Sequence, residues 1–163
     1  MDDATLCVPV SYLRVALDIG VIDVVDVVQW ADTKLATLEN PPYAVIELAL
    51  MGRSNREEVM WQLLQVATPA ISEAEMLPYA LAVAHSRLLS EPDLGRRLAE
   101  GIYRLWARHG CYLPGALESC GYFDDAYGLA DSGIHGSAES IDQELLEFTA
   151  GFASLDWQSI KVT

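Results

Sequence analysis

The sequence predicts an all-α protein, a compact bundle or short solenoid of helical hairpins with about seven to eight helices. Two observations predict this fold class. Apolar residues recur at intervals of three and four over most of residues 1–110. Capping residues, prolines and glycines stand between these stretches, where helices begin and end. We expect a single domain over residues 1–163, in which 1–110 is a helical-hairpin scaffold and 111–163 is an acidic, glycine-rich segment plus a final helix.

The first two helices are expected on either side of a glycine. Ser11 is a candidate cap for the first helix, and Gly20 is suited to end it. Val21 to Leu38 is rich in β-branched residues, which favours a strand. A period of 3.6 nevertheless separates its apolar residues from Asp23 and Asp26 better than a period of 2 does. A second helix is therefore predicted, with Asp23 near its N-terminus, where negative charge is favourable.

Four further helices are predicted up to residue 110. They are a nearly all-apolar helix over 43–51, a helix capped by Ser54, a helix from Ser72 to about Ser90, and a helix from Pro92 to Gly110. Ser54 and Ser72 each precede a glutamate by three residues, which is the capping-box pattern. Pro78 falls within the third of these helices, so a kink or a later start is expected there.

The character of the sequence changes after Cys111, where glycines become frequent and the apolar periodicity weakens. Short helical turns are expected at 114–119 and 124–130. A final helix capped by Ser137 or Ser140 should follow. Trp157 in the tail is expected to dock on the rest of the chain, because a large apolar side chain gains from burial.

The charge of the chain bears on its partners. It has 24 acidic and 10 basic residues, which give a net charge of −14. Residues 111–163 hold nine acidic residues and one basic residue, so this third carries more than half of the imbalance. Repulsion from phosphates argues against nucleic acid as a ligand, whereas a basic protein partner would be attracted. Solubility alone is the other explanation of such a charge.

The sequence also predicts where the protein is found. No apolar run approaches the ~18 residues that cross a bilayer, so no membrane partner is expected. The acidic N-terminus lacks the basic and then apolar order of a secretory signal. Cys7, Cys111 and Cys120 are too few for a disulfide framework. We therefore expect a cytoplasmic protein.

No spacing of residues calls for a catalytic, metal or cofactor site. His109, Cys111, Cys120 and His135 lack the paired spacing of a zinc site. The chain also lacks G-x-S-x-G, H-E-x-x-H and a phosphate-binding glycine loop. We expect no enzyme, no metal and no cofactor. The alternative hypothesis, from a different functional class, is a small enzyme or metal protein built around His85, His109 and His135.

Acidic and aromatic residues are interleaved after Cys111, as in a surface that anchors a basic partner. The candidate partner-binding residues are Glu118, Tyr122, Asp124, Asp125, Tyr127, Asp131, Glu139 and Asp142. Core aromatics separated by solvated acids are the alternative. The basic cluster between Arg96 and Arg108 has three interpretations: a patch for an anion, a solvated face with pairs such as Glu100 to Arg104, or a partner of the acidic segment.

The run ALDIGVIDVVDVVQWADTKL, followed by PPYAVIELAL, resembles the opening helices of bacterial immunity proteins of contact-dependent growth inhibition and related polymorphic-toxin systems. The resemblance covers about the first third of the chain. It implies stoichiometric binding to a cognate toxin domain, usually a nuclease with a basic cleft, which an acidic face occludes. The alternative is an α-helical repeat adaptor that binds a peptide or protein partner without catalysis.

Overall fold

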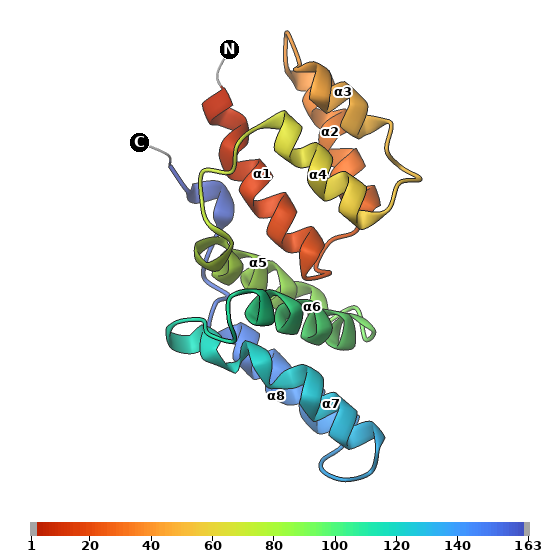
Figure 1. The fold of residues 1–163 in the computed structure, drawn as a ribbon, viewed down its shortest axis with the longest axis vertical. Helices are drawn as coiled ribbons and strands as arrows, with labels where there is room; N and C mark the ends of the chain where they lie inside the picture. Colours follow the sequence, from red (N-terminus) through yellow and green to blue (C-terminus); the bar gives the residue numbers. More distant parts are fainter. Residues whose placement is uncertain (1–2, 162–163) are drawn as a thin grey trace. The chain divides into compact units, whose positions relative to one another are not determined.

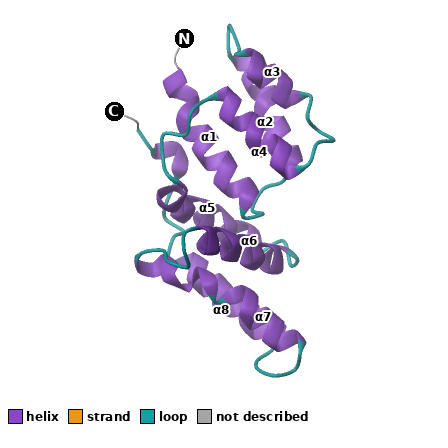
Figure 2. Ribbon diagram, in the orientation of Figure 1, coloured by secondary structure: helices purple, strands orange, loops and turns teal. Residues whose placement is uncertain are grey.

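The part of the chain that the structure describes, residues 3–161 of a computed structural model, is helical (Figure 1). Eight α-helices and two short 3₁₀-helices occur there, and Figure 2 shows loops between them and no strand. In chain order they are α1 (Asp3–Asp18), α2 (Val24–Thr37), α3 (Tyr43–Ala49), α4 (Arg56–Val66), α5 (Glu73–Leu88), α6 (Leu94–Arg108), η1 (Gly115–Gly121), α7 (Phe123–Asp131), α8 (Ala138–Ala150) and η2 (Trp157–Ser159). The predicted all-α fold class is confirmed.

The chain divides into two compact units. Of the described residues, the first unit comprises 3–18, 22–77 and 156–161. The second comprises Ile19–Val21 and Pro78–Leu155. The division therefore falls inside α5, and residues 111–155, which include all eight candidate partner-binding residues, belong to the same unit as α6.

In the first unit, α2 packs against α3, α3 against α4, and α4 against α1. Its fully buried apolar side chains include Val27, Val45, Leu48, Val59 and Leu63. The η2 helix lies on α1, where the ring of Trp157 stacks on that of Tyr12 with their centroids 4.4 Å apart. Trp157 thus docks as the sequence predicts.

Side-chain caps explain why α2 is a helix despite its valines. Oδ1 of Asp23 accepts hydrogen bonds from the backbone N–H groups of Val25 and Asp26, at 3.0 and 3.2 Å. In return, the Asp26 carboxylate accepts from the N–H of Asp23 at 2.9 Å. This reciprocal pair satisfies N–H groups that a helix N-terminus leaves without partners. The polar residues that made a strand doubtful are therefore the ones that start the helix.

The predicted start of the first helix is wrong. The helix α1 begins at Asp3, well before Ser11, and contains Pro9. Ser11 does not cap it, because its hydroxyl donates to the carbonyl of Cys7 at 2.7 Å. A proline inside a helix removes one N–H donor. Burial of apolar side chains such as Leu6, which is 4% exposed, offsets that loss.

The predicted cap of α4 is also wrong, by one residue. Asn55 caps this helix in place of Ser54, because its side chain accepts from the N–H of Glu58 at 2.9 Å. Asparagine is at least as favourable a cap as serine, so the overlapping pattern that begins at Asn55 forms. The caps predicted at Ser72 and Ser137 are confirmed by their hydrogen bonds.

In the second unit, α6 packs against η1 and α7, and α7 packs against α8. The buried face of α6 carries Leu94, Leu98, Ile102 and Leu105, all fully buried. Gly101 lies on the same helix and contacts the backbone of Ile19. A Cβ atom built at Gly101 would lie 2.4 Å from the carbonyl oxygen of Ile19. A hydrogen atom is therefore the only side chain that this contact admits.

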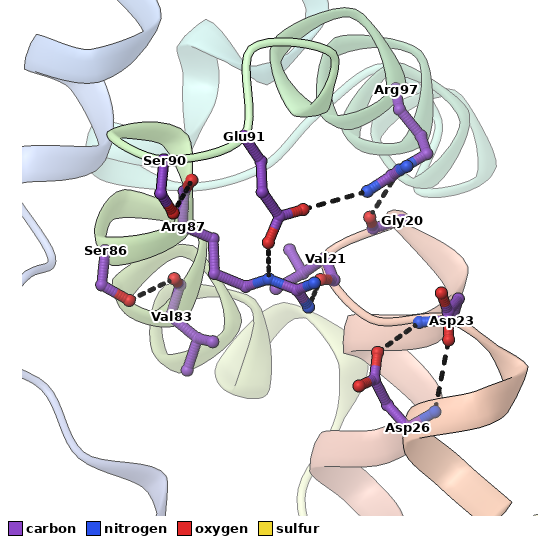
Figure 3. A network of polar contacts seen from close by, with 10 residues as sticks. All are labelled: Gly20, Val21, Asp23, Asp26, Val83, Ser86, Arg87, Ser90, Glu91 and Arg97. Carbon is purple, nitrogen blue, oxygen red and sulfur yellow. Dashed lines mark hydrogen bonds and ion pairs between the residues drawn. The ribbon is translucent and has the colours of Figure 1, made fainter.

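Two arginines bind the backbone carbonyls of Gly20 and Val21, the residues that directly follow Ile19 (Figure 3). Nη1 of Arg87 donates to the carbonyl of Val21, and Nε of Arg97 donates to that of Gly20 at 3.0 Å. Glu91 pairs with Arg87 at 2.7 Å and lies 3.8 Å from Arg97. Gly20 has φ +80°, so the prediction that a left-handed glycine follows α1 is confirmed.

Candidate functional site

The predicted partner-binding residues lie on successive helices of the second unit. Glu118 is on η1, Tyr122 is at its junction with α7, Asp124, Asp125, Tyr127 and Asp131 are on α7, and Glu139 and Asp142 are on α8. The helix α7 buries Phe123, Ala126 and Tyr127, which leaves its other face for the acidic residues. The eight residues separate into a paired group, a like-charged cluster and a set of exposed side chains.

Three of these residues form a paired group around Arg96 of α6. The guanidinium of Arg96 makes a bidentate ion pair with Asp131, at 2.5 and 2.7 Å. It also lies over the ring of Tyr127, 4.9 Å from the centroid. The hydroxyl of Tyr127 in turn donates to Oδ1 of Asp142 on α8. This group joins α6, α7 and α8, so its members have a structural role within the unit.

The protonation of this group follows from its contacts. The hydrogen bond from Arg96 lowers the pKa of the Asp131 carboxyl, so Asp131 is ionised at neutral pH. Burial, and then the hydrogen bond to Asp142, raises the pKa of the Tyr127 phenol. Tyr127 therefore remains a donor at neutral pH. Since its side chain is 4% exposed, a partner has little of it to contact.

A cluster of like charges lies where α6 and α7 pack together. Burial raises the pKa of Asp124, and the neighbouring negative charges of Glu100 and Asp125 raise it further. Arg104 acts in the opposite direction, but its guanidinium also pairs with Glu100 at 2.9 Å. The pKa of Asp124 is therefore raised on balance, with burial as the largest cause and the two neighbouring carboxylates adding to it.

Other predicted residues are exposed. Glu118, Asp125 and Glu139 face solvent, and no basic side chain among residues 3–161 lies within ion-pair distance of them. Tyr122 is 45% exposed, and a hydrogen bond with Glu144 raises the pKa of its phenol. Tyr112 is 70% exposed. This part of the surface therefore combines carboxylates with aromatic side chains that a partner can reach.

A cavity of about 550 Å³ occurs in the first unit and a smaller one, of about 240 Å³, in the second. The smaller one is lined by Leu88, Pro92, Gly95, Glu139, Asp142, Gln143 and Leu146. Its lining combines apolar residues with two of the predicted partner-binding residues, Glu139 and Asp142. Such a cavity matches a long basic side chain, which has an aliphatic stem and a charged end.

The histidines and cysteines of the described residues do not form a metal-binding cluster. Within residues 3–161, no three His, Cys, Asp or Glu side chains form a group that would hold a metal ion. Nδ1 of His85 lies 3.1 Å from the hydroxyl of Thr149. Burial raises the pKa of the Cys120 thiol to about 12, whereas Cys111 is exposed. Among the same residues, none of the helices has the length and apolar character needed to cross a membrane.

Three contributors to this surface were not among the candidate residues: Glu100, Tyr112 and Glu144. Glu100 was detectable, because Arg96, Glu100 and Arg104 are spaced four residues apart and so share one face of α6. The pairing of Arg104 with Glu100 matches the interpretation of the basic cluster as a solvated face with pairs along the helix. The pairing of Arg96 with Asp131 matches its interpretation as a partner of the acidic segment. The contact of Glu144 with Tyr122 had no signal in the sequence, because it depends on how α8 packs.

Comparisons of the chain with models of known families, with curated proteins and with solved structures returned no match.

Proposed function

We propose that the chain is an immunity protein, which binds a cognate bacterial toxin domain of the nuclease type and neutralises it by stoichiometric occlusion. The observation that supports the proposal is the group of Glu100, Asp124 and Asp125, where α6 and α7 pack together and the negative charges of Glu100 and Asp125 both raise the pKa of Asp124. Carboxylates held together in this way gain from a cationic partner, because the partner removes the repulsion. An active-site cleft that binds phosphates is such a partner.

The proposed contact combines charge with aromatic anchors. Tyr112 and Tyr122 present exposed rings, which supply contact area at a low cost in conformational entropy. Glu118 and Asp125 add exposed charge, which steers association. The cavity that Glu139 lines would accept one lysine or arginine of the toxin domain. No turnover is involved, since inhibition requires only that the cleft is covered.

The test is co-expression of the chain with the product of the adjacent gene, followed by purification and measurement of affinity at low and high salt. A complex with one copy of each chain is expected, and its association should slow several-fold as salt rises, because screening weakens steering. The D124N/D125N variant should associate more slowly than the wild type. The matched control is D32N/E39Q, which removes the same charge at exposed positions of the first unit and should associate at the wild-type rate.

Two results would count against this function. One is that no complex forms even at low salt. The other is that D124N/D125N and D32N/E39Q slow association equally, since net charge alone would then explain the effect.

A second candidate function is an α-helical adaptor that binds a protein or peptide on the first unit. The observation that favours it is a set of exposed apolar side chains on α3 and α4, which pack against each other. Tyr43 is 72% exposed, Leu50 directly after α3 is 81% exposed, and Trp61 on α4 is 63% exposed. Exposed aromatic side chains of this size are typical of contact surfaces. If W61A abolishes partner binding while D124N/D125N leaves it unchanged, the adaptor function replaces the first proposal.

A further inference from the structure

One cavity of the first unit is lined by an arginine, Arg14, whose buried Nε atom has no hydrogen-bond partner among residues 3–161. The cavity has a volume of about 550 Å³ and is lined by Ser11, Arg14, Val15, Leu64, Pro69, Ala70, Ile71, Ser72 and Glu73. These residues come from α1, α4, the α4–α5 loop and the start of α5. The volume falls within the range of about 300–1,000 Å³ that is typical of small-molecule sites.

Arg14 is the unusual residue of this wall. It is only partly exposed, and its Nε atom is buried with no hydrogen-bond partner. Arg14 also forms no ion pair with a carboxylate among the described residues. A guanidinium is charged at every physiological pH, and a buried donor without an acceptor is unfavourable. No acceptor within residues 3–161 reaches this Nε atom, so the charge of Arg14 is not neutralised by a direct pair there.

The two serine hydroxyl groups of the wall already have partners. The hydroxyl of Ser11 accepts from the N–H of Ile71 at 3.2 Å and donates to the carbonyl of Cys7. Ser72 is engaged with Glu75 through the cap of α5. Neither of these hydroxyl groups therefore serves as an acceptor for Arg14.

The apolar residues of the cavity wall indicate the chemistry of the rest of the ligand. Val15, Leu64, Pro69 and Ile71 line the same cavity, and Leu64 is 40% exposed. An aliphatic group placed there would cover apolar surface that now faces water. We propose that this cavity binds an oxyanion, either a carboxylate or a phosphate monoester, carried on a short aliphatic chain, with Arg14 as the group that binds the anion. The site does not depend on the function proposed for the second unit.

Glu73 opposes the anion, because its carboxylate belongs to the same wall. This gives the proposal a second prediction of opposite sign. Replacing Arg14 removes the attraction, whereas replacing Glu73 by glutamine removes a repulsion. Nonspecific adsorption of an amphiphile would not produce this pair of effects.

The experiment is calorimetric titration of the full chain with hexanoate and with hexyl phosphate, and with hexanol and hexylamine as uncharged and cationic controls. Both anions should bind more tightly than either control, and whichever anion binds more tightly identifies the head group. R14Q should weaken binding of the anions about tenfold or more, the size expected for losing charged hydrogen bonds. R53Q, at an exposed arginine of the same unit, should bind as the wild type does, and E73Q should bind more tightly.

R14K separates a role in binding from a role in folding. Lysine keeps the charge but lacks the planar fork, so R14K should bind the anions with an affinity between those of the wild type and R14Q. The proposal is overturned if neither anion binds the wild type. It is equally overturned if hexanol binds as tightly as the anions, or if R14Q binds like R53Q.

Discussion

Replacing Gly101 with alanine should destabilise the protein, although alanine is the better helix former. Gly101 lies within α6, where the same substitution in an open position stabilises a helix by about 1 kcal/mol. Here the new Cβ atom would lie 2.4 Å from the carbonyl oxygen of Ile19 and 2.5 Å from its Cα atom. Both are backbone atoms, which cannot rotate away as the end of a side chain can.

The magnitude follows from these two opposing effects. Overpacking in a well-packed core costs about 1–3 kcal/mol, and a clash with backbone belongs at the upper end of that range. A cost of about 3 kcal/mol less a gain of about 1 kcal/mol leaves a net loss of about 2 kcal/mol. For a chain of this length, that loss lowers the melting temperature by roughly 4–8 °C.

The assay is thermal unfolding followed by circular dichroism at 222 nm, with G128A as the matched control. Gly128 is also helical, on α7, and a Cβ atom built there meets nothing within 4 Å. G128A should therefore raise the melting temperature, because only the propensity effect applies. If G101A is as stable as the wild type or as G128A, the close contact of α6 with Ile19 is refuted.

Three further predictions concern titratable groups. The folded state lowers the pKa of Asp131, so the stability from its pair with Arg96 is complete above the ordinary value of 3.8 and is lost as the pH falls through the lowered value. The urea midpoint of D131N should therefore fall less than that of the wild type between pH 6 and pH 2, and an equal fall would contradict the pairing. The folded state raises the pKa of Asp124, so the ionisation of this carboxyl opposes folding at pH values above its ordinary pKa of 3.8. D124N should therefore raise the urea midpoint at pH 7 and leave it unchanged at pH 3. Burial raises the pKa of Cys120 to about 12, so a thiol reagent at pH 8 should modify exposed Cys111 quickly and Cys120 only after unfolding, as peptide mass spectrometry would detect.

The helices were largely predictable because their signals are local. The capping bonds of Asp23 with Asp26 join residues three positions apart, and Gly20 acts through its own backbone angle. The errors also have local causes. Ser54 and Asn55 begin overlapping cap patterns, and Pro9 was expected to precede a helix that in fact contains it.

The candidate surface was predictable in composition and not in detail. An acidic segment with interleaved aromatics is visible in the sequence, but burial decides which of its members a partner can reach. Tyr122 and Tyr127 are five residues apart and read alike, yet one is 45% and the other 4% exposed. Periodicity places residues on faces of one helix, and it does not say which face of a short helix meets its neighbours.

Local sequence therefore determined the helical class, most helix boundaries and the acidic character of the last third, because propensity and capping act over about four residues. Packing decided the rest through contacts between distant positions. Arg96 meets Asp131 at a separation of 35 residues, and Arg97 meets the carbonyl of Gly20 at a separation of 77. Arg14 shares a cavity wall with the start of α5 for the same reason. The buried Nε atom of Arg14, which has no acceptor within residues 3–161, becomes visible only when segments far apart in sequence are brought together.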